Sequence, residues 1–143
     1  MEDPLHALET LAPYVLTSHT RDGAVRGCPE GAEVAWTRMG NGNVGIDRYL
    51  DAFRRRCPAL PVMLEIIVMP GPRPLPFRDP AFWDGYRDMR ASEFQQFVDL
   101  VHRAGEVPLP GGPVDAAAEL ANVEASIQWT REYLGRPSAD GRR

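Results

Sequence analysis

The sequence has little cysteine, no long apolar run and no basic leader. Cys28 and Cys57 are its two cysteines, and their spacing matches neither a Cys-x-x-Cys motif nor the dense pattern of a secreted disulfide scaffold. No apolar run approaches the roughly 18 residues that a membrane-spanning helix needs. The first residues are acidic where a signal peptide is basic. These absences predict a reducing, cytoplasmic setting, with neither export nor membrane insertion.

An excess of basic residues is also missing. The chain has 16 basic and 20 acidic residues and a formal net charge of −4. The one basic run, Arg54 to Arg56, falls on a predicted amphipathic helix, where a solvated helix face accounts for it. Nucleic acid is therefore not an expected partner. The 43% of apolar residues is typical of a soluble protein with a real core.

The length limits the architecture. A chain of 143 residues is long enough for one ordinary domain, whereas a complete (β/α)₈ TIM barrel typically has about 250 residues. We therefore expect one domain or a piece of one.

The first part of the chain predicts a helix, a strand and a loop. Asp3-Pro4 is suited to cap and open a short helix that runs to Leu11. Residues 14–18 favour β-structure and predict a strand that ends at His19. The segment 22–45 is rich in Gly, Pro and Asn, so we expect a long loop with at most a short extended stretch at 34–36.

A helix and a second strand follow this loop. Apolar residues recur with helical spacing from Ile46 to Phe53, which predicts an amphipathic helix. Residues 62–68 are apolar except for Glu65, which predicts a buried strand. Strand, helix and strand in this order are typical of the parallel crossover unit, so residues 1–70 are predicted to be α/β.

The second part, residues 71–143, is predicted to be helical. Residues 70–76 are too rich in proline for a helix or a sheet and are expected to form an extended linker. Helices are expected after Asp79-Pro80, over residues 92–105 and from Asp115 to Leu134. The last of these presents an apolar stripe formed by Leu120, Val123, Ile127 and Leu134.

Two residues stand out as candidates for chemistry. Glu65 interrupts an apolar strand, and burying an ionised carboxylate costs several kcal/mol unless it is paired or bound to a cation. A metal or catalytic role and a structural salt bridge both satisfy this requirement, and exposure at the end of the strand would avoid it. His19 lies where a strand meets a loop, the usual place of ligand sites in parallel α/β proteins. With Asp22 it forms a His-x-x-Asp run, whose donors suit Mn²⁺, Co²⁺, Mg²⁺ or Zn²⁺.

Two other features have a simple alternative explanation. The run Gly40-Asn41-Gly42-Asn43 can bring backbone amides to an anionic or polyhydroxy substrate, but a tight turn explains it equally well. An aromatic group suits either core packing or a wall for stacking a sugar, with packing favoured. Its members are Phe77, Phe82, Trp83 and Tyr86.

Three segments together resemble the end of the sugar phosphate isomerase/epimerase family. They are Val15–Asp22, Met39–Asp47 and Leu64–Ile66. The family has a strand that ends in His-x-(Lys/Arg)-Asp, a Gly-x-Gly loop followed by a helix, and a final strand with a glutamate. Its fold is the xylose isomerase-like TIM barrel. The resemblance covers residues 5–70 and implies that they form the last two β/α units of such a barrel, strands seven and eight, followed by a helical C-terminal extension over 71–143.

The resemblance also implies a reaction and a set of site residues. Members of the family hold a divalent metal ion with Glu, Asp, His and Glu, and His19 and Glu65 match the last two of these ligands. Two glutamates move a proton while the metal stabilises an enediolate, and Glu65 would be one of them. Arg21 and Asp22 are the candidates for contacts with the substrate, a small sugar or sugar phosphate.

Strands one to six of the family, with two of its metal ligands, have no counterpart here. We therefore expect an isomerase fragment that is incomplete as a stand-alone enzyme. Its expected partner is a complementing barrel chain or a second copy of itself. One alternative is a non-catalytic helical interaction or dimerisation module derived from the barrel. Another is a metal-dependent phosphoesterase similar to endonuclease IV, which the acidic balance and the three histidines disfavour.

Overall fold

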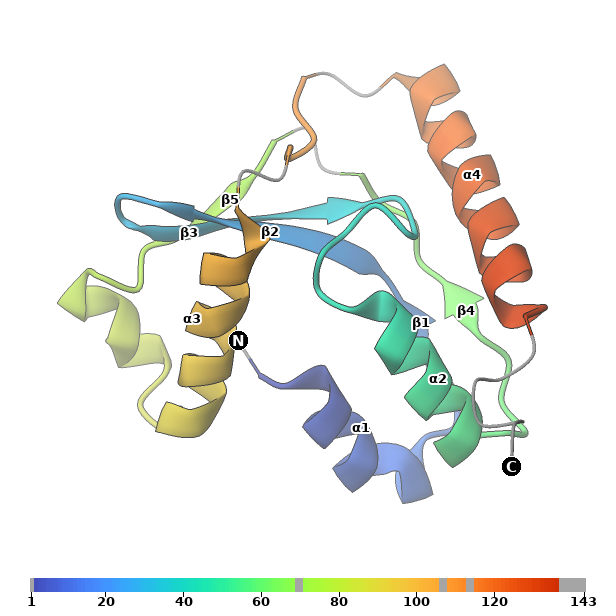
Figure 1. The fold of residues 1–143 in the computed structure, drawn as a ribbon, viewed down its shortest axis with the longest axis horizontal. Coiled ribbons are helices and arrows are strands. Elements are labelled where there is room, and N and C mark those ends of the chain that lie inside the picture. Colours follow the sequence, from blue (N-terminus) through green and yellow to red (C-terminus); the bar gives the residue numbers. More distant parts are fainter. Residues whose placement is uncertain (1, 69–70, 106–107, 113–114, 137–143) are drawn as a thin grey trace.

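The computed structural model describes residues 2–68, 71–105, 108–112 and 115–136. Figure 1 shows helices arranged around a small, strongly twisted set of strands. The elements in chain order are α1 (Pro4–Leu11), the 3₁₀-helix η1 (Ala12–Tyr14), β1 (His19–Thr20), β2 (Asp22–Cys28), β3 (Gly31–Thr37), α2 (Ile46–Arg56), β4 (Met63–Leu64), β5 (Arg73–Leu75), the 3₁₀-helix η2 (Pro80–Gly85), α3 (Ala91–Ala104) and α4 (Ala116–Leu134).

The predicted parallel pair is present. β1 pairs with β4 in parallel, with His19 opposite Met63 and Thr20 opposite Leu64, and α2 lies between these strands in the sequence. β4 is shorter than the strand predicted over 62–68, and the strand predicted over 14–18 is wrong. Ala12–Tyr14 is a 3₁₀-helix with a proline at its start, and β1 begins only at His19. The pairing extends only as far as the bond from the amide of Glu65 to the carbonyl of Thr20, at 3.0 Å, because the chain then leaves β1 and enters β2. The fold is therefore α/β as expected, and the described residues form no closed barrel.

The expected loop over residues 22–45 is wrong for residues 22–37, which form two strands and the turn between them. β2 and β3 form an antiparallel hairpin in which Cys28 pairs with Gly31, so the turn is Pro29-Glu30. Glycine and alanine have low intrinsic strand preference. The alternation of apolar and polar side chains that marks a strand is therefore weak in this segment. Ala24, Ala32 and Ala35 are almost fully buried, so small size here serves close packing.

The proline-rich segment also joins a sheet, contrary to expectation. β5 pairs antiparallel with β3, with Pro74 opposite Glu33, and it forms the edge of the three-stranded sheet β2-β3-β5. Proline is tolerated on an edge strand because the missing amide can face outward. α3 then packs on β2, where Val101 joins Val25 and Ala32 in one buried cluster.

The helices on the other side of the molecule cover β4. Asp3 caps α1 by accepting a hydrogen bond from the amide of Leu5 at 2.9 Å, as the sequence predicts. α2 is amphipathic as expected, and Leu50 and Phe53 on it are nearly inaccessible. Phe53 packs with Leu8 of α1, whereas Leu50 packs with Met39, Leu64 and the aromatic side chains of α4.

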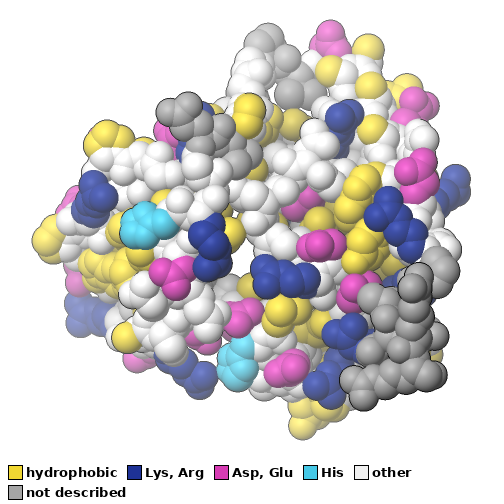
Figure 2. All heavy atoms as spheres, in the orientation of Figure 1, with side chains coloured by type: hydrophobic (Ala, Val, Ile, Leu, Met, Phe, Trp, Pro, Cys, Tyr) yellow, Lys and Arg dark blue, Asp and Glu magenta, His cyan; other side chains and the backbone are white. Residues whose placement is uncertain are grey.

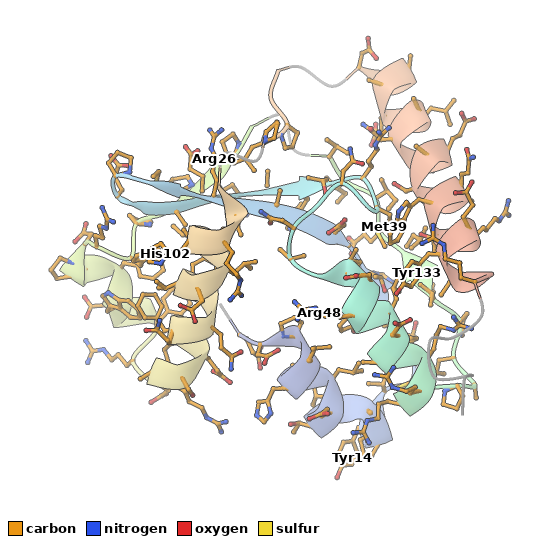
Figure 3. All side chains as sticks on the ribbon, viewed as in Figure 1. Tyr14, Arg26, Met39, Arg48, His102 and Tyr133 are labelled. Carbon is orange, nitrogen blue, oxygen red and sulfur yellow. The ribbon has the colours of Figure 1, made fainter. Side chains whose placement is uncertain are left out.

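α4 does not bury the apolar stripe that the sequence suggests. Leu120 is 59% exposed and Ile127 is 37% exposed, whereas Ser126 and Thr130 are buried. The hydroxyl of Ser126 accepts a hydrogen bond from the amide of Met39 at 3.1 Å, so this small polar side chain allows α4 to lie close to the turn after β3. Met39 and Tyr133 lie at this contact (Figure 3). In the described part of the chain, no helix is both long enough and apolar enough to cross a membrane.

The cluster around Leu50 predicts a large difference between two identical substitutions. Leu50→Ala removes a fully buried side chain and should lower the free energy of unfolding by about 2–5 kcal/mol. Leu120→Ala, on the exposed face of α4, should change it by less than about 0.5 kcal/mol. Urea denaturation followed by circular dichroism measures both values. Equal losses would contradict the assignment of Leu50 to the core.

Candidate functional site

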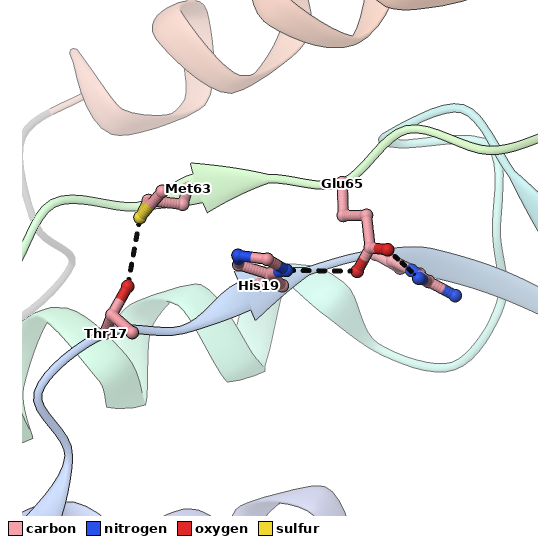
Figure 4. Close-up of polar contacts among 5 residues, drawn as sticks. Thr17, His19, Met63 and Glu65 are labelled. Atoms are coloured by element: carbon pink, nitrogen blue, oxygen red, sulfur yellow. Dashed lines mark hydrogen bonds and ion pairs between the residues drawn. The ribbon is translucent and has the colours of Figure 1, made fainter.

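His19 and Glu65 converge on one space, as the sequence predicts. In the parallel pair, His19 lies directly opposite Met63, and Glu65 is two residues further along the chain. Side chains two residues apart in an extended segment point to the same face, so Glu65 extends over the face that carries His19 (Figure 4). His19 Nδ1 lies 3.4 Å from Glu65 Oε2. The imidazole is 60% exposed and the carboxylate 34% exposed, so the pair is accessible to a ligand.

Arg21 completes this arrangement from the other side of the carboxylate. Its guanidinium pairs with Glu65 Oε1, so the two carboxylate oxygens have different neighbours, Arg21 and His19. The same guanidinium lies 4.1 Å from the centre of the Trp36 ring. Trp36 belongs to β3 and is the site neighbour that the sequence analysis missed. The available signal was an aromatic residue in a hairpin whose cross-strand partner, Gly23, has no side chain.

These neighbours keep Glu65 ionised. The hydrogen bond from Arg21 is the largest cause of a pKa below the ordinary value for glutamate. Burial opposes this effect, and the charges of Arg21 and His19 add to it. The carboxylate is therefore charged at neutral pH, the form that can accept a proton or bind a cation, and its lowered pKa makes it a weaker base than an ordinary glutamate. Its interactions stabilise the fold above the ordinary pKa of 4.5, and this contribution is lost as the pH falls through the lower folded-state pKa.

Asp22 does not join this site. Its side chain is 1% exposed, and its carboxylate accepts hydrogen bonds from the amides of Gly23, Gly40 and Gly42 at 2.8, 2.9 and 2.9 Å. Burial raises the pKa of Asp22, and the three amide donors oppose that rise. Asp22 therefore holds the turn after β3, and its carboxylate is turned away from the position of a substrate beside Glu65.

The Gly-x-Gly loop binds a carboxylate of its own chain. A side chain on Gly42 would collide with the carboxylate of Asp22, which explains the glycine at that position. Asn43 continues along the free edge of β2, where its side chain accepts from the amide of Val25 at 2.9 Å and donates to the carbonyl of Val25 at 2.8 Å. The loop amides of Gly40 and Gly42 are thus used for folding, which favours the turn over the substrate contact as the explanation of this run.

A hollow of 330 Å³ is lined in part by His19, Arg21, Gly45 and Tyr49, and Glu65 is not among its lining residues. Its size lies in the range of sites for small ligands. On the face shown in Figure 2, acidic and basic side chains are interspersed around the central depression, so this face has no single sign of charge.

His19 and Glu65 fit only a part of a metal site. They supply one imidazole and one carboxylate, which are suitable donors for Mn²⁺, Co²⁺, Mg²⁺ or Zn²⁺. Within residues 2–68, 71–105, 108–112 and 115–136, no three His, Cys, Asp or Glu side chains lie close enough to hold an ion. The remaining donors must therefore come from outside this group if a metal is bound here.

The aromatic group packs around the start of α3. Trp83 meets Phe94 edge to face at 4.8 Å between ring centres, and its indole donates a hydrogen bond to the carbonyl of Phe77 at 2.9 Å. Phe82 stacks on Tyr86 at 4.7 Å. These contacts support core packing, the favoured of the two readings.

Comparisons of this chain with protein-family models, with curated proteins and with solved structures found no match.

The role of Asp22 predicts a strong effect on stability. Asp22→Ala leaves three backbone amides without their acceptor, and each buried amide without a partner costs about 1–3 kcal/mol. We expect the free energy of unfolding to fall by at least about 2 kcal/mol in urea denaturation. Asp84→Ala is the control, because Asp84 forms an exposed ion pair with Arg87 and should contribute less than about 1 kcal/mol. If the two variants are equally stable, Asp22 does not anchor the turn.

Proposed function

We propose that this chain carries part of the active site of a metal-dependent sugar isomerase or epimerase. The observation that supports this function is the convergence of His19 and Glu65 from adjacent parallel strands, with the Nδ1 to Oε2 distance of 3.4 Å. The resemblance of the three sequence segments to the sugar phosphate isomerase/epimerase family supplies the reaction class. The substrate is a small sugar or sugar phosphate, and the reaction moves a proton at a carbon next to a carbonyl group.

In this proposal Glu65 is the group that moves the proton. Glu65 is ionised at neutral pH, as its lowered pKa requires, and the carboxylate is the form that can accept a proton from the carbon of the substrate. Arg21 holds Oε1, which leaves Oε2 directed toward the side of His19. One carboxylate oxygen is thus fixed in position while the other faces the space in which the substrate would bind.

His19 and Glu65 would also provide two ligands of the divalent metal ion. A bound ion would polarise the oxygens of the sugar and lower the barrier to proton removal. The described residues supply neither the other ligands nor a second carboxylate beside Glu65. We therefore propose that a further polypeptide segment, corresponding to barrel strands one to six, completes the site.

Incorporation of solvent deuterium into a ketose tests this function. The chain alone, with Mn²⁺ or Co²⁺, should give no measurable exchange, because two ligands cannot fix the geometry of the ion. Together with a polypeptide that supplies the six missing strands, it should give metal-dependent exchange. In that complex, Glu65→Gln should lower the rate by about 100-fold or more, since it removes the group that accepts the proton.

Glu9→Gln is the matched control, because Glu9 also pairs with an arginine, Arg56, but on the exposed surface of α1 and α2. It should leave exchange unchanged. Robust exchange by the chain alone would contradict the incomplete site. Full activity of Glu65→Gln in the complex would exclude Glu65 as the base.

A second candidate function is self-association through the open face of β1 and β4. Leu16 is 86% exposed, Met63 43% and Ile67 42%. Met63 of β4 lies two residues before Glu65 and points to the same face. Exposed apolar side chains beside a short strand pair favour association with another chain. This observation supports the non-catalytic dimerisation module as the alternative to the enzyme.

Sedimentation velocity over a range of concentrations tests this alternative. We expect a concentration-dependent dimer that Met63→Glu weakens by about tenfold or more, because it places a charge within the apolar contact. Leu120→Glu, on the outer face of α4, should leave the dimer intact. A chain that stays monomeric at high concentration would rule out the dimerisation module.

A further inference from the structure

A second hollow lies between the start of α2 and the end of α4. Its volume is 450 Å³, which is within the range of sites that hold small molecules. Arg48 of α2 and Arg136, which follows α4, both line it. Asp47 is the one carboxylate among its described lining residues, so the side chains around the hollow carry a net positive charge at neutral pH. None of these three residues takes part in the reaction proposed above.

An aromatic stack on α4 holds Arg136 beside this hollow. Trp129 and Tyr133 lie about one helical turn apart, and their rings stack with 5.2 Å between centres and 12° between planes. The guanidinium of Arg136 lies over the Tyr133 ring, 5.7 Å from its centre. The Tyr133 hydroxyl donates a hydrogen bond to the carbonyl of Asp47 at 3.0 Å, and Figure 3 shows Tyr133 between α4 and α2. The stack is thus joined to α2, and it restricts an arginine at the surface.

Two glycines allow the other side of the hollow to form. Trp129 lies directly against Gly40, where a side chain would collide with the five-membered ring of the indole. At Gly45, a β-carbon would lie 2.9 Å from Nη2 of Arg48, so the guanidinium of Arg48 folds back over the backbone of this glycine. Both glycines have a positive φ, 85° and 83°, which favours glycine for a second reason.

Both guanidinium groups are available to a ligand. In the part of the chain that the structure describes, neither Arg48 nor Arg136 forms an ion pair, whereas four other arginines each pair with a carboxylate. A guanidinium binds an anion through two parallel hydrogen bonds. A phosphate monoester offers three free oxygens to two such groups, whereas a carboxylate offers two. The arrangement therefore favours a phosphate group over a carboxylate.

We propose that this hollow binds the phosphate group of a small phosphorylated molecule, with Arg48 and Arg136 as the residues that hold it. The volume exceeds that of a phosphate group, so the rest of the molecule has room beside it. The hollow is distinct from the one beside His19, with which it shares Gly45 and Ile46 alone. Binding here requires neither a metal ion nor the proposed reaction.

An NMR titration of the full chain at low ionic strength tests this site. The ligands are glycerol 3-phosphate, inorganic phosphate and glycerol. The signals are the indole N–H of Trp129, assigned with Trp129→Phe, and the amides of residues 45–48. Both phosphates should shift these signals until the site is saturated, and glycerol should not. Glycerol 3-phosphate should bind more tightly than inorganic phosphate, because it fills more of the hollow.

Three substitutions should change the binding in opposite directions. Arg48→Gln and Arg136→Gln should each weaken binding of glycerol 3-phosphate by about tenfold or more, because each removes charged hydrogen bonds to the phosphate. Asp47→Asn should tighten it by about two- to fivefold, because it removes a charge that repels the ligand.

Arg87→Gln and Asp84→Asn are the matched controls, because they make the same changes in an exposed ion pair elsewhere on the surface. They should leave binding unchanged. Amide spectra establish that each variant is folded.

Three results would overturn the proposal. If phosphate moves none of the signals around Trp129 and the start of α2, the hollow is not a phosphate site. If Arg87→Gln weakens binding as much as Arg48→Gln, the ligand responds to the charge of the whole surface. If inorganic phosphate binds as tightly as glycerol 3-phosphate, the hollow holds the free ion and not a phosphorylated molecule. None of these results depends on deuterium exchange, so this test and that of the proposed enzyme function can fail separately.

Discussion

The buried carboxylate of Asp22 constrains the structure at the point where three segments meet. It lies at the first position of β2, directly after the pair of β1 with β4, and it binds the amides of the turn that leads from β3 to α2. A buried carboxylate must keep its hydrogen bonds, because their loss costs more than an ordinary surface contact. The parallel pair, the hairpin and the start of α2 therefore cannot shift independently of one another.

This constraint also sets the direction of the neighbouring side chain. Successive residues in an extended chain point to opposite faces, so fixing Asp22 under the turn directs Arg21 to the other face. Glu65 and Trp36 lie on that face. Asp22, which does not face the candidate site, thus determines that Arg21 does. In the His-x-x-Asp run, His19 is exposed beside Glu65, whereas Asp22 is buried in the fold.

The charges around Glu65 form a small compensated cluster. Arg21 occupies one oxygen and His19 faces the other, so the carboxylate remains ionised although it lies against an otherwise apolar strand. This arrangement provides the salt bridge that is one of the explanations for a glutamate in this strand. The partial exposure of His19 and Glu65 distinguishes the cluster from a purely internal ion pair, because a ligand can reach them.

The sequence by itself determined the elements whose signals are local. Helical spacing predicted α2 and α3, capping by Asp3 and Asp115 marked two helix starts, and apolar runs around one crossover helix predicted the parallel pair that brings His19 and Glu65 together. Only the tertiary structure decided the hairpin, the inclusion of Pro74 in a sheet edge and the buried face of α4. In these regions, small or polar residues are buried against neighbours that are distant in the sequence. The spacing of apolar residues along the chain does not reveal such contacts. The same holds for Trp36, because its contact with Arg21 depends on the register of two strands.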